Sequence, residues 1–251
     1  MKKRGSNTVL GNLWWILDPL LQMVVYVVLV TIIRSRPGPD YPLFIMAAIL
    51  PWKWYSAVIN DATSSVVRHE KLIRQIAFPK LVLPMSTTTA GVVGFAWGMI
   101  PLALLMLLYP HRLSAMLLFI PLIAAVQFVF TLASAILFAA ANVFFRDLGH
   151  AIGHSLRLWW FLSPGLYSLY ELNRLSIVQE NPIIATLAAF NPFAVLFEAY
   201  RAVIYGGPDG VTPPHPPDLG SLLILLAVSV VLLGLCVIFF KRVEPEFAKV
   251  L

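Results

Sequence analysis

The chain has 251 residues, of which 59% are hydrophobic and 12% are charged, about half the charged share of an ordinary soluble domain. Its mean hydropathy is +0.83, and a soluble core of this size cannot bury that much apolar surface. The same composition excludes a disordered chain, and a lone cysteine, Cys236, excludes a disulfide-stabilised scaffold. The sequence therefore predicts an integral membrane protein.

Taken in chain order, six apolar stretches reach or approach the roughly 20 residues that a helix needs to cross a bilayer. The first contains Asp18-Pro19, an N-cap residue followed by proline, which predicts a regular helix that begins at Asp18. We expect an all-α integral membrane protein with a single domain over residues 1–251. Its six transmembrane helices are predicted at about 13–33, 41–60, 84–109, 113–145, 155–170 and 219–240.

The basic residues predict the orientation, because Lys and Arg concentrate on the cytoplasmic side of a membrane protein. With the N-terminus inside, eleven basic residues lie in inner segments and five in outer ones, so both termini are expected in the cytoplasm. The inner set is Lys2, Lys3, Arg4, Arg68, Lys71, Arg74, Lys80, Arg146, Lys241, Arg242 and Lys249, and the outer set is Arg34, Arg36, Arg112, Arg174 and Arg201. They form no stripe interleaved with aromatic residues, so no nucleic-acid partner is expected despite the net charge of +6.

The inner connection over residues 61–83 has the pattern of a short amphipathic helix that Asp61 can cap. One face is apolar and the other is basic or polar. These faces consist of Val66, Ile73 and Ile76, and of Arg68, Lys71 and Gln75. Two interpretations stay open: a helix lying in the headgroup layer, or a docking surface for a cytoplasmic partner.

The outer connection over residues 171–218 contains two apolar runs, 183–190 and 193–197, that are too short to cross a bilayer and are separated by Asn191-Pro192. Such segments are usually re-entrant or interfacial, so short helices are expected here between helices five and six. Glu198 and Arg201 are three residues apart and can pair on one helix face.

Motifs for chemistry are mostly absent from the sequence. There is no G-x-x-x-x-G-K-[ST] phosphate loop and no G-x-S-x-G elbow. His150 and His154 have a metal-compatible spacing but lack further ligands, and the scarcity of acidic residues within the spans argues against a proton relay. We expect no catalytic residues, no metal and no cofactor in this chain.

A cation within the second span stands out. Lys53 lies about twelve residues into that span, where a charge costs roughly 2.5–3.5 kcal/mol, so it should snorkel, face a partner or face a polar pathway. Aromatic side chains in the spans form an interfacial belt or line a path for sugar rings. They include Trp52, Trp97, Trp160 and Tyr167.

A stripe of small residues, Gly91, Gly94 and Gly98, marks the third span. Small residues on one helix face allow close packing. We expect a contact within the chain in preference to a dimer contact.

Several stretches carry a resemblance to a known family, in the same order and on matching sides of the membrane. They are Thr8–Trp14 with Leu17–Leu20, Lys71–Lys80 with Leu83-Pro84, Asn142–Asp147, Trp160–Pro164 with Tyr167, Asn191-Pro192 with Glu198–Arg201, and Glu244–Ala248. Together they resemble the membrane subunit of ABC-2 type exporters for polysaccharides and polyol phosphates, which include the O-antigen, capsule and teichoic acid exporters. The likeness runs nearly end to end.

The resemblance implies a homodimer in the cytoplasmic (inner) membrane, with two copies of a separate ABC ATPase that bind ATP and Mg. Residues implied for coupling to the ATPase are Arg68, Lys71, Arg74, Phe78, Pro79, Arg146 and Asp147. Short outer helices would form an extracellular gate that includes Asn191, Pro192, Glu198 and Arg201. The cargo would be a glycan on an undecaprenyl-type carrier, and the path for it would include Lys53, Trp52, Trp97, Trp160 and Tyr167, with Lys53 meeting a lipid-linked pyrophosphate.

The leading hypothesis is thus a permease for a lipid-linked polysaccharide, and two alternatives stay open. An ABC-2 permease for drugs or small molecules would share the helix plan, although the Phe78-Pro79 and Asn142–Asp147 motifs favour the polymer exporters. A membrane glycosyl- or acyltransferase would need acidic or histidine residues gathered at one membrane face, and here they are scattered.

Overall fold

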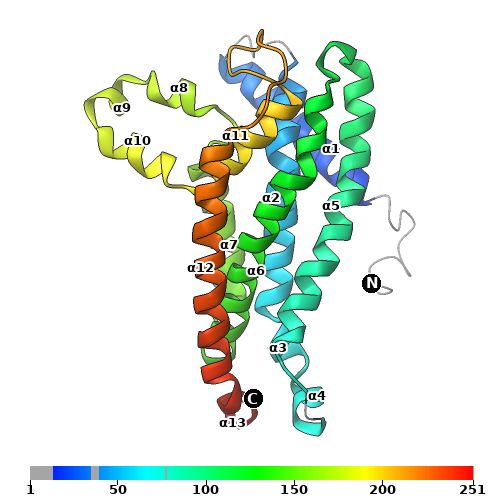
Figure 1. The fold of residues 1–251 in the computed structure, drawn as a ribbon, viewed down its shortest axis with the longest axis vertical. Helices are drawn as coiled ribbons and strands as arrows, with labels where there is room; N and C mark the ends of the chain where they lie inside the picture. The colour runs from blue at the N-terminus through cyan, green and yellow to red at the C-terminus, as the bar shows by residue number, and fades with distance from the viewer. Residues whose placement is uncertain (1–13, 35–39, 77, 251) are drawn as a thin grey trace.

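The computed structural model describes residues 14–34, 40–76 and 78–250, and all regular structure within these ranges is helical, as predicted (Figure 1). The α-helices are α1 (Trp14–Arg34), α2 (Tyr41–Thr63), α3 (Ser65–Arg68), α4 (Glu70–Gln75), α5 (Val82–Leu108), α6 (Ile120–Phe144), α7 (Leu148–Leu162), α8 (Leu169–Asn173), α9 (Ser176–Glu180), α10 (Pro182–Ala189), α11 (Pro192–Ile204), α12 (Leu219–Val243) and α13 (Phe247–Val250). Short 3₁₀ helices cover Pro110–Arg112, Ala115–Phe119 and Glu244–Glu246. The Thr8–Leu13 part of the first motif and the basic residues Lys2, Lys3, Arg4 and Arg36 lie outside the described residues.

Five helical segments are long and apolar enough to cross a membrane, and they correspond to five of the six predicted spans. They are Ile16–Ile33, Tyr41–Thr63, Val82–Leu108, Ala115–Phe144 and Leu219–Glu246. The remaining prediction, the fifth span over 155–170, is wrong at its boundaries: α7 has 15 residues, begins at Leu148 and ends at Leu162. Pro164 lacks an N–H and disfavours helical geometry at Ser163, so the helix stops there at roughly 22 Å in length.

Two predicted helix starts are also wrong. Helix α1 begins at Trp14 and contains Pro19, because a proline this close to a helix start removes only one backbone hydrogen bond. Asp61 lies inside α2 and does not cap a new helix. Thr63, fully buried, extends α2 past it and donates its hydroxyl to the carbonyl of Ile59 at 2.6 Å.

Helix α2 is the centre of the fold. Helices α1, α5, α6, α7 and α11 all pack against it, and α12 packs along α6 (Figure 1). Large side chains of α2, among them Leu43, Ile45 and Ile49, are completely buried. The core therefore surrounds α2, which has the length and hydropathy of a membrane span although most of its surface contacts other helices of the chain.

The glycine stripe on α5 packs within the chain, as predicted. A Cβ atom at Gly91 would lie 2.2 Å from Cγ2 of Val58, and one at Gly98 would lie 3.0 Å from Cδ2 of Leu50. Small residues are thus needed where α5 approaches α2 most closely.

We call the end of the bundle with α3, α4 and α13 the α4 end, and the opposite end, with α8 to α11, the α11 end (Figure 1). At the α11 end, α8, α9 and α10 form an arm that projects sideways from the bundle, with Ile183 and Phe190 71% and 82% exposed. Helix α11 is instead buried, and Phe193 and Phe197 have no exposed surface. Asn191-Pro192 separates α10 from α11, as the sequence predicts.

Candidate functional site

A groove of about 310 Å³ lies between α1, α2 and α7, and we call it the α1–α2–α7 groove. Ten residues line it: Gln22 and Tyr26 from α1, Trp52, Ser56 and Asn60 from α2, and Gly153, Leu156, Arg157, Trp160 and Phe161 from α7. The α2 residues are four apart, so they lie one above the other on one helix face. An aromatic and polar lining is unusual on a bundle whose outer helices are apolar.

The groove has a polar half and an aromatic half. Asn60 faces Gly153, because a Cβ atom there would lie 3.6 Å from Oδ1 of Asn60. Trp52 faces Trp160, with ring centroids 5.6 Å apart. Since α2 and α7 run antiparallel, Ser56 and Arg157 lie between these levels, and the polar half is toward the α4 end.

Stacking orders the aromatic half. The ring of Tyr26 stacks on Trp160 with centroids 5.7 Å apart and an interplanar angle of 19°. Gln22 donates to the hydroxyl of Tyr26 at 3.2 Å. The indole N–H of Trp160 is buried and has no acceptor among the described residues. The groove therefore contains an ordered aromatic surface.

Two of the five residues predicted for the substrate path, Trp52 and Trp160, line this groove. Lys53 does not line the groove. It forms an ion pair with Asp18 of α1, so of the three environments expected for this cation the structure shows a charged partner within the chain. Trp97 lies on α5, 41% exposed, and Tyr167 lies in the turn after α7. The structure brings the first two together and leaves these three outside the lining.

Arg157 is a groove residue that the sequence analysis missed. It lies within the apolar segment 155–170, so the signal that identified Lys53, a cation inside a predicted span, was equally available for it.

Two of the four predicted gate residues, Glu198 and Arg201, form a pair at the α11 end. The Arg201 side chain is 2% exposed and pairs with Glu198 at 3.4 Å, which confirms the predicted ion pair. It also donates to the carbonyls of Gly165 at 2.6 Å and Tyr167 at 3.1 Å, and its guanidinium lies 3.7 Å from the ring centroid of Phe44. These contacts fix α11 against α2 and the turn that follows α7.

Asn191, the second predicted gate position, caps α11 and joins it to α7. Its Oδ1 accepts from the backbone N–H of Phe193 at 3.0 Å and from the indole of Trp159 at 3.3 Å. Its Nδ2 donates to the hydroxyl of Ser163 at 2.8 Å. Pro192 follows at the first helical position, which suits its fixed φ angle.

Arg112, predicted only as one of the outer basic residues, hydrogen-bonds to the loop that follows α11. Its guanidinium donates to the carbonyls of Tyr205 at 2.8 Å, Thr212 at 2.9 Å and Gly210, and to Asp40 at 2.9 Å. Burial alone would raise the pKa of Asp40. Hydrogen bonds from His111 and Arg112 outweigh that effect and lower the pKa below its ordinary value.

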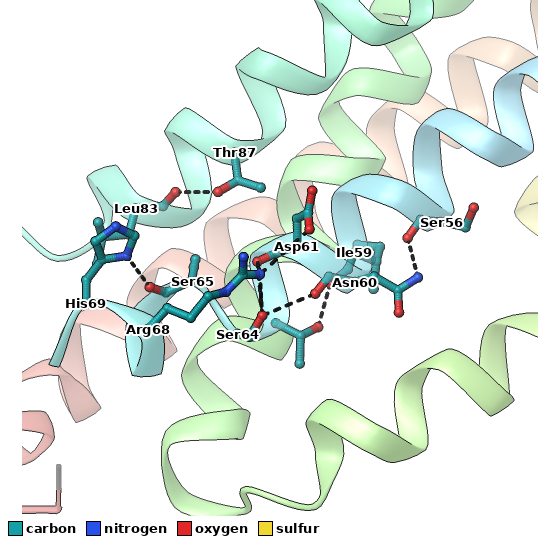
Figure 2. Close-up of polar contacts among 11 residues, drawn as sticks. Ser56, Ile59, Asn60, Asp61, Ser64, Ser65, Arg68, His69, Leu83 and Thr87 are labelled. Carbon is teal, nitrogen blue, oxygen red and sulfur yellow. Dashed lines mark hydrogen bonds and ion pairs between the residues drawn. The ribbon is translucent and has the colours of Figure 1, made fainter. Parts of the chain in front are cut away.

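The predicted coupling residues lie at the α4 end. Arg68 turns back toward α2, where it donates to the carbonyl of Asp61 at 2.8 Å and to Ser64 (Figure 2). Arg74 pairs with Glu70 at 3.0 Å, while Lys71 is exposed. Ile76 is 56% exposed, because α4 ends at Gln75, so the prediction that it shares a face with buried Val66 and Ile73 is wrong.

A hollow of about 620 Å³ at the α4 end includes two more of the predicted coupling residues, Arg146 and Asp147, at the α6–α7 corner. It is lined by Val143, Phe144, Phe145, Arg146, Asp147, Leu148, Ala151 and Val250. Phe145 is 69% exposed there. Phe78 and Pro79 lie elsewhere, between α4 and α5.

Comparison with known proteins gives the family. No family model matches the chain. It is 32% identical over 249 residues to the O-antigen export system permease protein RfbA of Myxococcus xanthus, which covers 99% of this chain and 91% of the relative. It is 25% identical over 252 residues to the O-antigen export system permease protein RfbA of Klebsiella pneumoniae, covering 100% and 91%. The chain therefore belongs to the family of O-antigen export permeases, the ABC-2 type membrane subunits that transport polysaccharide.

Proposed function

We propose that this chain forms the passage through which a lipid-linked polysaccharide of the O-antigen type crosses the cytoplasmic membrane. The observation that carries the proposal is the α1–α2–α7 groove, whose aromatic and polar lining differs from the apolar exterior of the bundle. Aromatic faces pack on the C–H faces of sugar rings while polar side chains accept and donate hydrogen bonds to hydroxyl groups.

The proposed topology has six spans, of which α7 is a short fifth, and places both termini in the cytoplasm. The excess of basic residues in the segments at the α4 end supports this orientation. The arm of α8, α9 and α10 then lies on the outer side with α11 as a re-entrant helix, and the two together act as the gate. Asn191, Pro192, Glu198 and Arg201 hold α11 in place there.

The α4 end is proposed as the docking face for the ATPase. Helix α4 lies at the tip of the bundle, and Arg68, Lys71 and Arg74 all come from this short inner connection (Figure 1). The hollow at Arg146 and Asp147 offers a second contact with exposed phenylalanine. ATP and Mg belong to that partner, which we expect in two copies.

A second copy of the chain is proposed to complete the passage. A two-fold related copy would add a second α1–α2–α7 groove to the passage. The cargo is proposed to be a glycan on an undecaprenyl pyrophosphate-type lipid, with Trp52 and Trp160 on its path. Lys53, Trp97 and Tyr167 remain candidate positions outside the groove lining.

Co-purification with a candidate ABC ATPase from the same organism tests the proposal. We expect a stable complex whose ATP hydrolysis rises when lipid-linked glycan is added in a bilayer. A complex whose hydrolysis responds to small apolar drugs and not to the glycan would contradict it. So would a purified chain that consumes a lipid-linked sugar donor without any ATPase.

A further inference from the structure

The arm formed by α8, α9 and α10 carries an apolar stripe that nothing in the described part of the chain covers. Its side chains, Ile183, Leu187 and Phe190, are 71%, 67% and 82% exposed. They follow one another at intervals of four and three residues, so they lie on one face of α10 and its C-cap. Exposed apolar surface of this kind marks a contact with a membrane or with another protein.

The charges of the arm are kept apart from this stripe. Glu171, Arg174 and Glu180 all precede α10, and residues 182–190 contain no charged side chain. Helix α8 lies farther from the α4 end than α10 does, and α10 packs against α8 and α9 (Figure 1). The arm is therefore a hairpin with a charged limb, residues 169–180, and an apolar limb, residues 182–190, that lies nearer the α4 end than α8.

The apolar limb lies at the height of side chains that face lipid. Figure 1 shows α10 at the same height along the bundle as the first turns of α12. There Leu223 and Ile224 are 64% and 68% exposed, on a helix long and apolar enough to cross a membrane. An amphipathic helix at this height lies in the plane of the interface, with its apolar face buried roughly 5–10 Å into the boundary between headgroups and acyl chains.

Two side chains of the charged limb suit the headgroup layer. The guanidinium of Arg174 lies 5.4 Å from the ring centroid of Tyr170 and donates to its hydroxyl at 3.3 Å. Tyrosine and long basic side chains concentrate at membrane surfaces. A protein partner would not require charged and apolar limbs to be separated along the axis of the bundle, whereas a bilayer surface does. The arrangement therefore favours lipid over a second copy of the chain.

We propose that α10 is an interfacial anchor whose Ile183, Leu187 and Phe190 side chains insert into the outer leaflet of the lipid bilayer. This inference rests on the proposed function only for the topology that places the α11 end outside, and it adds a lipid contact to that end. Only Phe190 and Asn191 separate α10 from α11. An anchored α10 therefore holds the start of the proposed gate helix at the membrane surface.

The test measures how deeply a fluorescent label on the arm lies in the bilayer. Single cysteines are introduced as Leu187→Cys in the apolar stripe or as Asn173→Cys, at an exposed position of the charged limb. The full chain, with Cys236→Ala, is reconstituted in phosphatidylethanolamine–phosphatidylglycerol vesicles. An NBD label at position 187 should be quenched by lipids with a nitroxide on the acyl chain, at a depth of roughly 5–10 Å. The label at position 173 should be quenched by iodide in water and not by these lipids.

A matched pair of added charges tests whether the stripe itself inserts. With the label at Ile183→Cys, Leu187→Asp should reduce quenching by the nitroxide lipids about twofold or more, because a carboxylate resists transfer into the acyl layer. Asn173→Asp adds the same charge to the other limb and should leave the quenching unchanged. Ile183→Cys also serves as the depth reporter should Leu187→Cys not assemble.

Two results would overturn the inference and leave the proposed function intact. One is a label at position 187 that iodide quenches as strongly as the label at position 173, with no quenching by nitroxide lipids. The other is a label shielded from both quenchers until the chain is diluted to one copy per vesicle, because a second copy would then cover the stripe. If an impermeant maleimide reaches Asn173→Cys only from the cytoplasmic side of sealed membrane vesicles, the proposed topology fails, and the placement of α10 in the outer leaflet fails with it.

Discussion

Lys80 and Glu244, 164 positions apart in the chain, hold each other by two hydrogen bonds. The backbone N–H of Lys80 donates to Oε1 of Glu244 at 2.8 Å, and Nζ of Lys80 donates to the carbonyl of Glu244 at 3.3 Å. Fully buried Phe247 follows and packs against Phe240 and Phe144. The end of α12 is therefore hydrogen-bonded to the connection between α4 and α5. A displacement of α4 should consequently move α5 and α12 together.

Glu244→Ala should weaken the connection between α12 and the segment that joins α4 to α5. Because the N–H of Lys80 loses its acceptor, we expect two- to fivefold less polysaccharide exported per ATP hydrolysed, on the order of 1 kcal/mol in coupling. Export and hydrolysis are measured together in proteoliposomes. Glu246→Ala is the control, since Glu246 is exposed and pairs only with Lys249 among the described residues. An export-to-hydrolysis ratio equal in both variants would contradict the prediction.

Charge reversal of Arg68, Lys71 and Arg74 should prevent the ATPase from co-purifying, because it replaces the basic residues of the proposed docking face with acidic ones. Arg68 and Arg74 also contact Asp61 and Glu70 within the chain. Lys71→Glu alone, at an exposed position, separates docking from these local contacts. Arg174→Glu, at an exposed position after α8 at the opposite end of the bundle, should leave the complex intact. A complex of normal yield in the triple variant would place docking elsewhere.

Replacing Arg201 with Leu should lower the stability of the α11 end by about 3 kcal/mol, because the carbonyls of Gly165 and Tyr167 would lose a charged donor inside the protein. Glu198→Gln should cost less than 1 kcal/mol, since Glu198 is 34% exposed. Thermal unfolding in detergent, followed by tryptophan fluorescence, measures both. Similar losses in the two variants would mean that the ion pair, and not the buried carbonyl contacts, holds α11.

Gly91→Ala should destabilise the packing of α5 on α2 by about 1–3 kcal/mol, because its Cβ would overlap Cγ2 of Val58. Val58→Ala added to it should restore part of that loss. Gly234→Ala is the control: nothing lies within 4 Å of its Cβ position, so it should be neutral or stabilising. Additive losses in the double variant would argue against the contact.

Stability at acid pH should depend on Asp40. Its pKa in the folded protein lies below the ordinary value of 3.8, so the unfolded chain takes up the proton first as the pH falls. The stabilisation is therefore complete above about pH 5 and is lost progressively below about pH 4 as the carboxylate becomes protonated. Asp40→Asn, which tolerates the left-handed backbone at φ 57°, should unfold at a temperature that changes less between pH 5 and pH 3. An identical slope in both proteins would contradict this assignment.

The sequence predicted features that depend on neighbours along the chain. Hydropathy located five membrane-length helices because each apolar stretch is itself long enough to satisfy its backbone hydrogen bonds in lipid. The spacing of Glu198 and Arg201 placed them on one helix face, and the ion pair follows from that local geometry. The Asn191-Pro192 break between two short helices is likewise local.

Tertiary structure decided the features that join distant segments. Lys53 and Arg157 are equivalent in the sequence, since both are cations in apolar stretches, but packing placed Asp18 beside the first and opened a groove at the second. Arg112 became buried only because the loop after α11 folds over it. Hydropathy reports the preference of a residue for lipid or water. A groove, a counter-ion or a long-range contact such as Lys80–Glu244 depends instead on which helix faces pack together.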